Sequence, residues 1–345
     1  MNRRRNKKKS VWPKILLFMV ILVMAAFFFG HREEIKEKEE KTQWLEGSML
    51  RIGDTQVDYR EGMIYLDAVQ KDYEQYYGSD IWKYAIDAQG NTMGEVIKEQ
   101  TLEQIIYIKV VCQKASELGI VLSEEELQTV DMQTADYMEK LKNSELLLHG
   151  VNADIVRRIY ADNLLARKTF EATTLNVDTD IPNEEAAQRR FYTIAIRNFK
   201  IDASGKRVSY EGEELTELKA RVQNLREQAV TSENFYKFAS SNTEESAMLE
   251  ITGGVGDFPA DYEAKVLALS TGEVSEVIET KDYYYIFYCV TDFDMDATYD
   301  KKEEIIIARQ EEEFRTRYQE WREMTHIEVN EEMWGALDFE MDSVG

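Results

Sequence analysis

Histidine and cysteine, which supply many catalytic and metal-binding groups, are scarce in this chain of 345 residues. The three histidines are His31, His149 and His326. Ser-His-Asp and Cys-His sites need a histidine beside the nucleophile, and no credible arrangement of either kind is present. Cys112 and Cys289 lie far apart in sequence among apolar residues, so we expect buried free thiols. No Cys/His metal pattern occurs, and we expect neither a metal nor a cofactor.

Basic charge is also scarce once the first 30 residues are set aside. Those residues carry seven lysines and arginines and no acid, and the rest of the chain carries 35 basic against 66 acidic side chains. This excess of negative charge argues against nucleic acid and against an anionic membrane surface as partners. It is typical of a solvated extracellular module.

Two short patterns are similar to ligand sites but lack an essential residue. Asp292, Asp294, Asp296 and Glu303 match positions of a calcium-binding loop, but Ala297 occupies the position that needs glycine. We therefore expect no calcium site. The run TGGVGDF has glycines but lacks the Lys-Ser/Thr pair of a phosphate-binding loop, which excludes that function.

The N-terminus has the pattern of a membrane anchor. Residues 1–14 are basic, residues 15–30 are apolar, and residues 31–47 form a charged stalk. Counted from Val11, the apolar run approaches the ~20 residues that span a bilayer. The basic flank places residues 1–14 in the cytoplasm and the bulk of the chain outside the cytoplasmic membrane. The alternative is a cleaved signal peptide, but no small-residue cleavage site follows Ala26, so we favour an uncleaved anchor.

Beyond the stalk, the chain is predicted to be mainly helical up to about residue 175. A hairpin with a Gly-Asp turn is expected over residues 49–59. Apolar spacing predicts strong helices over 101–118 and 155–173. Ser123 and Glu126 form a capping-box pattern, which predicts the start of another helix.

The second half of the chain combines strands with helices, so the predicted fold class is α+β. The expected elements are strands at 190–197 and 283–290, a hairpin-like excursion around Gly205, helices at 211–230, 232–241 and 300–324, and a loop at 242–254.

Residues 252–290 carry the most specific pattern, TGGVGDFPADYEAKVLALSTGEVSEVIETKDYYYIFYCV. A glycine turn leads to an apolar helix, the turn STGEVS and a strand rich in aromatic residues. This segment resembles the C-terminal half of a parvulin-type peptidyl-prolyl isomerase domain, whose pattern is GGDLGxF, an apolar helix ending L-x-x-GEVS, and a GYHII strand. The resemblance implies a small antiparallel sheet with helices.

The preceding helices, with the segments ASELGIVLSEEEL and IPNEEAAQRRFY, resemble the N-terminal region of the SurA/PrsA family of extracytoplasmic foldases. The resemblance implies a helical chaperone module at 48–187 and a parvulin-like domain at 188–296. It implies that residues 297–345 form a C-terminal helix and tail that pack on the helical module. An anchored member without a lipid-attachment cysteine suits a Gram-positive envelope.

The family's active site, by the same resemblance, uses two strand histidines and a loop acid or thiol. Thr193 and Tyr285 occupy the histidine positions, and Glu245, with Glu244 beside it, matches the loop acid. Thr193 and Tyr285 are candidates for a hydrogen bond across the sheet; the alternative is ordinary strand packing. Glu245 is a candidate for polarising the peptide carbonyl; the alternative is a solvated loop charge.

The proline pocket of the family is better matched. Phe258, Tyr262 and Leu267 correspond to apolar positions that hold the prolyl side chain. Gly253, Gly254 and Gly256 are expected to give the adjoining turn its backbone freedom. The alternative is that these residues are ordinary core.

Three functions remain open at this point. The first is a chaperone that binds unfolded or newly exported polypeptides, with the parvulin-like domain as a peptide-binding module. The second is an active prolyl isomerase that works without the histidine pair. The third is a non-catalytic scaffold of a membrane complex.

Overall fold

The computed structural model describes residues 44–339 except 142–144. The predicted basic segment, the membrane anchor and most of the stalk lie outside the described residues. Within the described part, no helix has both the length and the apolar character needed to cross a bilayer.

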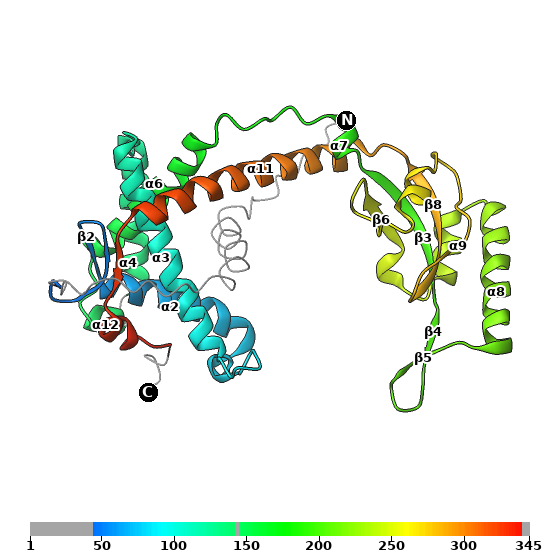
Figure 1. Cartoon of the computed structure of the whole chain (residues 1–345), viewed down its shortest axis with the longest axis horizontal. Helices are drawn as coiled ribbons and strands as arrows, with labels where there is room; N and C mark the ends of the chain where they lie inside the picture. The colour runs from blue at the N-terminus through cyan, green and yellow to red at the C-terminus, as the bar shows by residue number, and fades with distance from the viewer. Residues whose placement is uncertain (1–43, 142–144, 340–345) are drawn as a thin grey trace. The chain divides into compact units, whose positions relative to one another are not determined.

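The chain divides by its internal contacts into two compact units (Figure 1). The helical unit comprises residues 1–175 and 314–345, and the sheet unit comprises residues 176–313. Residues 176–187, which we expected in the helical module, therefore group with the sheet unit. Residues 297–313, which we expected with the C-terminal tail, do the same.

The helical unit combines α-helices with a small antiparallel sheet. The helices are α2 (Tyr59–Tyr77), the 3-10 helix η1 (Ser79–Lys83), α3 (Met93–Glu117), α4 (Glu124–Lys140), α5 (Glu145–Leu148), α6 (Ala153–Thr173), α12 (Glu331–Gly335) and the last part of α11 (Met295–Met324). The sheet has the order β2-β1-β9, from β1 (Ser48–Ile52), β2 (Thr55–Asp58) and β9 (Ile327–Val329). The antiparallel pair β1 and β2 confirms the predicted hairpin, whereas β9 was not predicted.

Capping boxes fix the starts of two helices in this unit. The Ser123 hydroxyl accepts from the Glu126 N–H and the Glu126 carboxylate accepts from the Ser123 N–H, so the predicted capping box is confirmed. A second box, formed by Thr92 and Glu95, starts α3 well before residue 101, where we expected this helix to begin. Each box satisfies backbone donors that the first helical turn leaves free.

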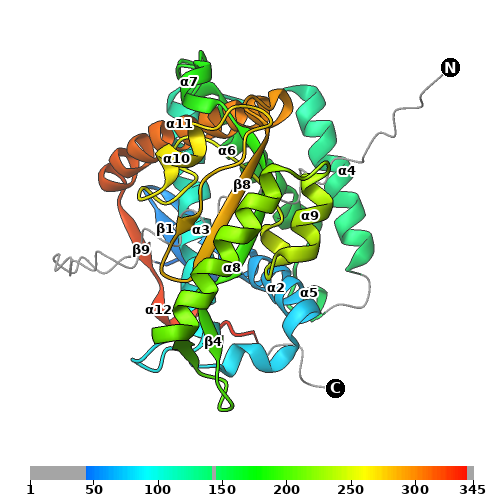
Figure 2. The same cartoon turned by 90° about the vertical axis from the view of Figure 1, so that its right-hand side faces the viewer.

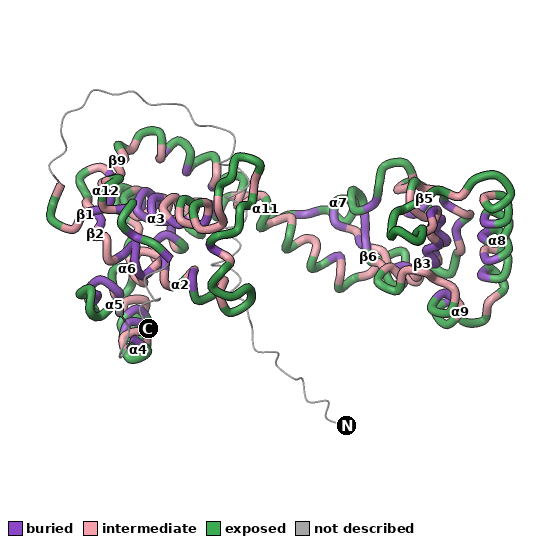
Figure 3. The backbone as a smooth tube through the Cα atoms, turned by 90° about the horizontal axis from the view of Figure 1, so that it is seen from below, coloured by how far each residue is buried: buried purple, intermediate pink, exposed green. Residues whose placement is uncertain are grey.

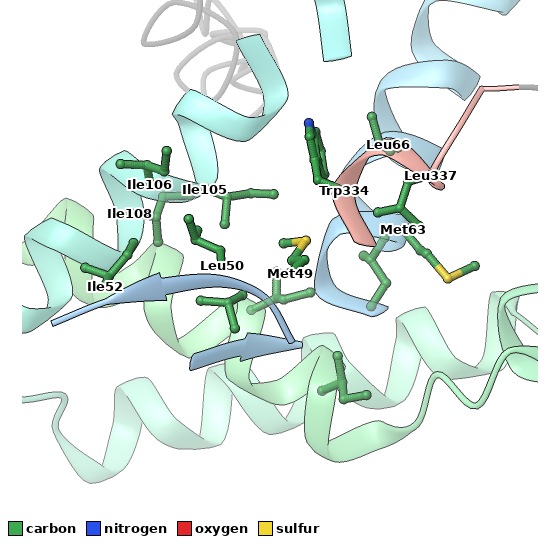
Figure 4. Packing of buried hydrophobic residues seen from close by; sticks show 14 of the residues in the cluster. Met49, Leu50, Ile52, Met63, Leu66, Ile105, Ile106, Ile108, Trp334 and Leu337 are labelled. Atoms are coloured by element: carbon green, nitrogen blue, oxygen red, sulfur yellow. The ribbon is translucent and has the colours of Figure 1, made fainter. Parts of the chain in front are cut away.

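Segments far apart in sequence fill the core of the helical unit together (Figure 4). Met49 and Leu50 on β1 are fully buried, as is Ile105 on α3. Trp334 and Leu337, which follow β9, belong to the same buried cluster. The residues after α11 are therefore an integral part of this core.

The sheet unit is built on an antiparallel sheet with the order β6-β3-β8-β7. Its strands and helices are α7 (Asn183–Ala186), β3 (Arg189–Arg197), β4 (Phe199–Ile201), β5 (Arg207–Ser209), α8 (Gly212–Val230), α9 (Phe235–Asn242), the 3-10 helix η2 (Ser246–Met248), β6 (Glu250–Gly253), α10 (Glu263–Leu267), β7 (Ile278–Glu279), β8 (Tyr283–Thr291) and the first part of α11. The predicted strands and helices are confirmed, but η2 and β6 lie in the segment that we expected to be a loop. The helix after the glycine turn is short.

Helix α11 begins at Met295, within the acidic run, because Asp294 caps it. The Asp294 carboxylate accepts from the Ala297 N–H at 3.2 Å. Asp296 and Glu303 therefore lie on a helix and not in a twelve-residue loop of the calcium-binding kind. Among the described residues, no group of three or more Asp, Glu, His or Cys side chains is placed to hold a metal ion.

The two faces of the sheet unit's sheet are covered differently (Figure 2). Helices α8 and α9 cover one face, where Ile194, Ile196 and Ile286 are fully buried. The buried residues of α8 recur at helical spacing along that helix (Figure 3). We call this the closed face. The opposite face, which carries Phe191 and Tyr285 and packs against α10 and the glycine turn, is called the open face.

Candidate functional site

Alternation along β8 brings the candidate residues to the open face. Tyr283, Tyr285 and Phe287 pack in the cluster on this face, whereas Tyr284 and Ile286 pack on the closed face. Our sequence analysis named Tyr285 alone. The strand period of two was the signal that would have added its two neighbours on the same face.

Thr193 and Tyr285 share the open face but do not bond each other. Across the β3–β8 pairing, Thr193 lies opposite Phe287 and Tyr285 lies opposite Ala195. The Thr193 hydroxyl is buried and has no hydrogen-bond partner among the described residues. The Tyr285 hydroxyl donates to the sulfur of Met248 on η2, at 3.7 Å. Of the two alternatives, the hydrogen bond is wrong and strand packing holds, because the strand register offsets the two residues.

Tyr262, just before α10, joins the glycine turn to β8. Its ring centroid lies 6.0 Å from that of Tyr285 and 6.4 Å from that of Phe258. The series continues from Tyr285 to Tyr283 at 5.6 Å and to Phe287 at 5.7 Å. We call these five residues the aromatic row. Phe258 and Tyr285 are 9% exposed, whereas Tyr262 and Tyr283 are half-buried, so part of the row is accessible to a ligand.

Glycine is required in the adjoining turn mainly for space. A Cβ atom on Gly254 would lie 2.1 Å from the carbonyl oxygen of Ala187, and one on Gly253 would lie 2.9 Å from the ring of Phe258. Gly256, in contrast, has a positive φ of 86°. The expectation of backbone freedom is therefore confirmed at Gly256 and wrong at Gly253 and Gly254, which allow a close approach of backbone and ring.

Glu245 is tied to the end of β3 by an ion pair. Its carboxylate lies 2.6 Å from an Arg197 guanidinium nitrogen and accepts a hydrogen bond from the Tyr283 hydroxyl at 3.3 Å. The hydrogen bond and charge of Arg197, together with Tyr283, hold the pKa of Glu245 below its usual value. Glu244 beside it accepts from the Arg197 backbone N–H at 2.9 Å. Glu245 thus orients the Tyr283 hydroxyl rather than standing alone in solvent.

The hydroxyls of Tyr262 and Tyr285 on the open face stay protonated at neutral pH. Burial, with a smaller contribution from neighbouring Tyr262, raises the pKa of Tyr285 to about 12. Burial also raises the pKa of Tyr262. Leu267 on α10 packs beside these rings. Residues 176–313 contain no histidine, so in this part of the chain the side chain that normally titrates near neutral pH is missing.

Two contacts of the site depend on tertiary structure that sequence reasoning missed. The Met248 sulfur accepts a hydrogen bond from the Tyr285 hydroxyl, and the Arg197 guanidinium forms an ion pair with the Glu245 carboxylate. Met248 lies 37 positions before Tyr285 in the sequence, and Arg197 lies 48 positions before Glu245. No local pattern in the sequence indicates either pair.

Solved structures that match this chain include a peptidyl-prolyl isomerase (PrsA) from Bacillus cereus, which is 15% identical, with a TM-score of 0.34. That match covers 70% of this chain and 90% of the other. A SurA-like chaperone from Campylobacter jejuni is 12% identical, covers 82% of this chain and 98% of the other, and has a TM-score of 0.30. At these scores, no conclusion about function follows from the similarity.

Among curated relatives, a foldase protein PrsA of Clostridium botulinum is 23% identical over 261 residues. The match covers 69% of this chain and 75% of the relative. A foldase protein PrsA of Clostridium kluyveri is 22% identical over 209 residues, which is 56% of this chain and 60% of the relative.

Two family models match different parts of the chain. The SurA-like N-terminal domain matches residues 1–144, and the PPIC-type PPIase (rotamase) domain matches residues 205–291. The second match contains the aromatic row but begins after β3, so Thr193 lies outside it. The chain thus combines a SurA-like N-terminal domain with a PPIC-type rotamase domain, and its relatives are PrsA foldases.

Proposed function

We propose that this chain is a membrane-anchored extracytoplasmic folding factor whose aromatic row binds proline-containing segments of unfolded exported proteins. The observation that carries the proposal is the aromatic row itself, whose rings at Tyr262 and Tyr283 are partly accessible. Aromatic surfaces bind extended, proline-containing segments well because such segments lose little entropy on binding. The Tyr262 hydroxyl can donate to a peptide carbonyl that flanks the proline.

The lack of histidine favours binding over catalysis. Rotation about an X-Pro bond is slow because it breaks amide resonance, at a barrier of ~18–20 kcal/mol. A catalyst must bind the twisted state more tightly than the ground state. On the open face, Thr193 is buried with its hydroxyl unpaired within the described structure, so it is poorly placed to contact a peptide.

An active isomerase is the second candidate, and one observation favours it. The reaction requires no proton transfer in principle, and Glu245 orients the Tyr283 hydroxyl beside Tyr285. The Tyr283 hydroxyl donates its hydrogen bond to Glu245 and therefore presents a fixed oxygen dipole. Fixed dipoles of this kind stabilise charge that shifts during a reaction.

The cellular location in this proposal follows from residues 1–30. Their basic and apolar pattern supports an anchor with the N-terminus in the cytoplasm. The resemblance to the foldase family supports a Gram-positive cell. The acidic remainder of the chain would then act outside the membrane on newly exported polypeptides, which are its expected partners.

The test uses the full-length chain in lipid nanodiscs, with empty nanodiscs as the baseline. Aggregation of a chemically unfolded client is followed by light scattering, and cis-to-trans relaxation of an acetylated Ala-Glu-Pro-Phe amide is followed in parallel. We expect aggregation to be suppressed and the relaxation rate to stay at the uncatalysed value. Tyr262→Ala should reduce the suppression, whereas Tyr236→Ala on α9 should not.

The other outcomes separate the candidates. A relaxation rate that rises with protein concentration and falls in Tyr285→Phe would establish the isomerase instead. No effect of the wild-type chain in either assay would reject both functions.

A further inference from the structure

A hydrogen-bonded network joins the glycine turn to the start of α11, with Gln188 at its centre. Gln188, the residue before β3, is buried. Its backbone N–H donates to the Thr298 hydroxyl at 3.0 Å, and its backbone carbonyl accepts from the Asp294 N–H at 2.7 Å. Its side-chain amide donates to Asp257 in the glycine turn at 3.2 Å. The backbone of Gln188 therefore bonds to the start of α11, and its side chain bonds to the glycine turn.

Asp257 closes the turn with both of its carboxylate oxygens. Oδ2 accepts from the Gly254 N–H at 2.8 Å and from Gln188, and Oδ1 lies 3.4 Å from the Lys301 ammonium on α11. Burial by itself would raise the pKa of Asp257, but these hydrogen bonds and the charge of Lys301 lower it below the usual value. The hydrogen bonds of the turn are thus charge-assisted at neutral pH, and such bonds are stronger than neutral ones.

The turn that Asp257 closes leads directly into Phe258, which forms one end of the aromatic row. There is little space for this turn to shift. Gly254 lies close to the Ala187 carbonyl, and the Phe258 ring lies directly against Gly253. The position of the Phe258 ring therefore depends on the contacts that hold the turn in place.

Helix α11 connects this network with the rest of the chain. It runs without interruption from Met295 to Met324. Phe314, Tyr318 and Trp321 near its end are buried in the core of the helical unit. The same helix therefore contributes a core segment to one unit and a turn-holding lysine, Lys301, to the other.

We propose that Asp257 is a positioning residue for the aromatic row, and that Lys301 at the start of α11 sets the position of Phe258 through it. The inference rests on the proposed function, peptide binding at the aromatic row. It deepens that function by assigning control of the binding face to residues that do not contact the peptide.

The test compares two properties of full-length variants in nanodiscs. The first is amide hydrogen exchange of residues 252–262 without peptide, measured by mass spectrometry. The second is the affinity for a fluorescein-labelled Ala-Leu-Pro-Phe-Ala peptide, measured by anisotropy. Asp257→Asn keeps an acceptor oxygen but loses the charge, and Lys301→Met removes the cation alone. Lys302→Met, the neighbouring lysine with no interaction with Asp257, is the matched control.

We expect Asp257→Asn and Lys301→Met to exchange faster over residues 252–262 with no change over α8. We expect both to bind the peptide about tenfold more weakly, the size of effect that loss of one charge-assisted interaction produces. Lys301→Arg should restore both properties. Wild-type behaviour in both variants would overturn the inference, and so would faster exchange spread equally over α8.

The wild-type chain separates this inference from the proposed function. If the wild-type chain does not bind the peptide, the proposed function fails. The exchange of residues 252–262 in the variants then still decides whether Asp257 and Lys301 hold the turn.

Discussion

The two faces of the sheet in the sheet unit are made by alternate residues of the same strands, yet they differ in what covers them. Both faces carry aliphatic and aromatic residues. The closed face is covered by the long helix α8 and by α9, whereas the open face is covered by a five-residue helix and a glycine turn. Tyr284 is almost fully buried on the first face, and its neighbour Tyr283 is half-buried on the second. In the proposed function, the closed face supplies stability and the open face binds the ligand.

The resemblance places Thr193 and Tyr285 where the family has histidines. The Thr193 hydroxyl is buried and has no hydrogen-bond partner among the described residues, and burial raises the pKa of Tyr285 to about 12. The open face has the glycines of the turn and the aromatic row. In the proposed function, this face binds a peptide through its rings and not through titrating groups.

The largest expected effect comes from breaking the closed face. Ile286→Ala removes a fully buried side chain from beneath α8 and α9. We expect a loss of ~2–5 kcal/mol in the free energy of unfolding, since large-to-small changes in a core leave a cavity. Urea denaturation of the full-length chain, monitored by amide hydrogen exchange of α8, measures this loss. Ile307→Ala on the exposed part of α11 is the control, and a similar loss there would contradict the comparison.

The open face should respond in the opposite way. Tyr262→Ala removes a half-buried ring that contacts Phe258, Tyr285 and Phe287. We expect peptide affinity to fall by about tenfold or more, as for the loss of an aromatic anchor, with a smaller loss of stability than Ile286→Ala. Anisotropy of the labelled peptide measures the affinity, and urea denaturation measures the stability. If Tyr262→Ala costs stability but leaves affinity unchanged, the open face is ordinary core.

A smaller effect is expected at Thr193. Its hydroxyl is buried without a partner among the described residues, and an unsatisfied buried polar group costs about 1–3 kcal/mol. Thr193→Val should therefore raise the free energy of unfolding by ~1 kcal/mol and leave peptide affinity unchanged. Thr291→Val is the matched control, because that hydroxyl donates to the Phe293 carbonyl at 2.9 Å and its loss should destabilise. Loss of binding in Thr193→Val would assign the hydroxyl a direct role.

The smallest expected effect is that of pH. The pKa of Glu245 is depressed, so the stability from its ion pair is present above the ordinary pKa and is lost as the pH falls through the lowered value. The pKa of Tyr285 is raised to about 12, so its protonated form persists until the pH approaches that value. Peptide affinity should therefore be flat between about pH 6 and 9. A step near pH 6.5, where histidine titrates, would contradict a histidine-free site.

Sequence reasoning succeeded where the signal is local. The capping box at Ser123 and Glu126, the hairpin after the stalk and the aromatic strand were all predicted and found. The glycine turn was predicted, but the reason for its glycines was wrong at Gly253 and Gly254. Close approach to another segment decides those positions, and the local sequence does not carry that information.

What sequence reasoning missed depends on pairing between distant segments. Strand β9 forms because β1 offers it an edge, with Leu50 opposite Val329. The offset between Thr193 and Tyr285 follows from the register of β3 and β8, which two isolated motifs do not specify. The ion pair between Arg197 and Glu245 also depends on two distant segments that meet in the fold. The sequence therefore predicted the candidate residues more reliably than their partners.

The most direct measurement is hydrogen exchange of the full-length chain in nanodiscs, with and without the Ala-Leu-Pro-Phe-Ala peptide. The same peptide with alanine in place of proline is the control. The account predicts that the prolyl peptide slows exchange over residues 252–267 and 283–287, which carry the aromatic row, and leaves α8 unchanged. Protection elsewhere in the chain without protection of these segments would contradict the claim that the open face is the binding site.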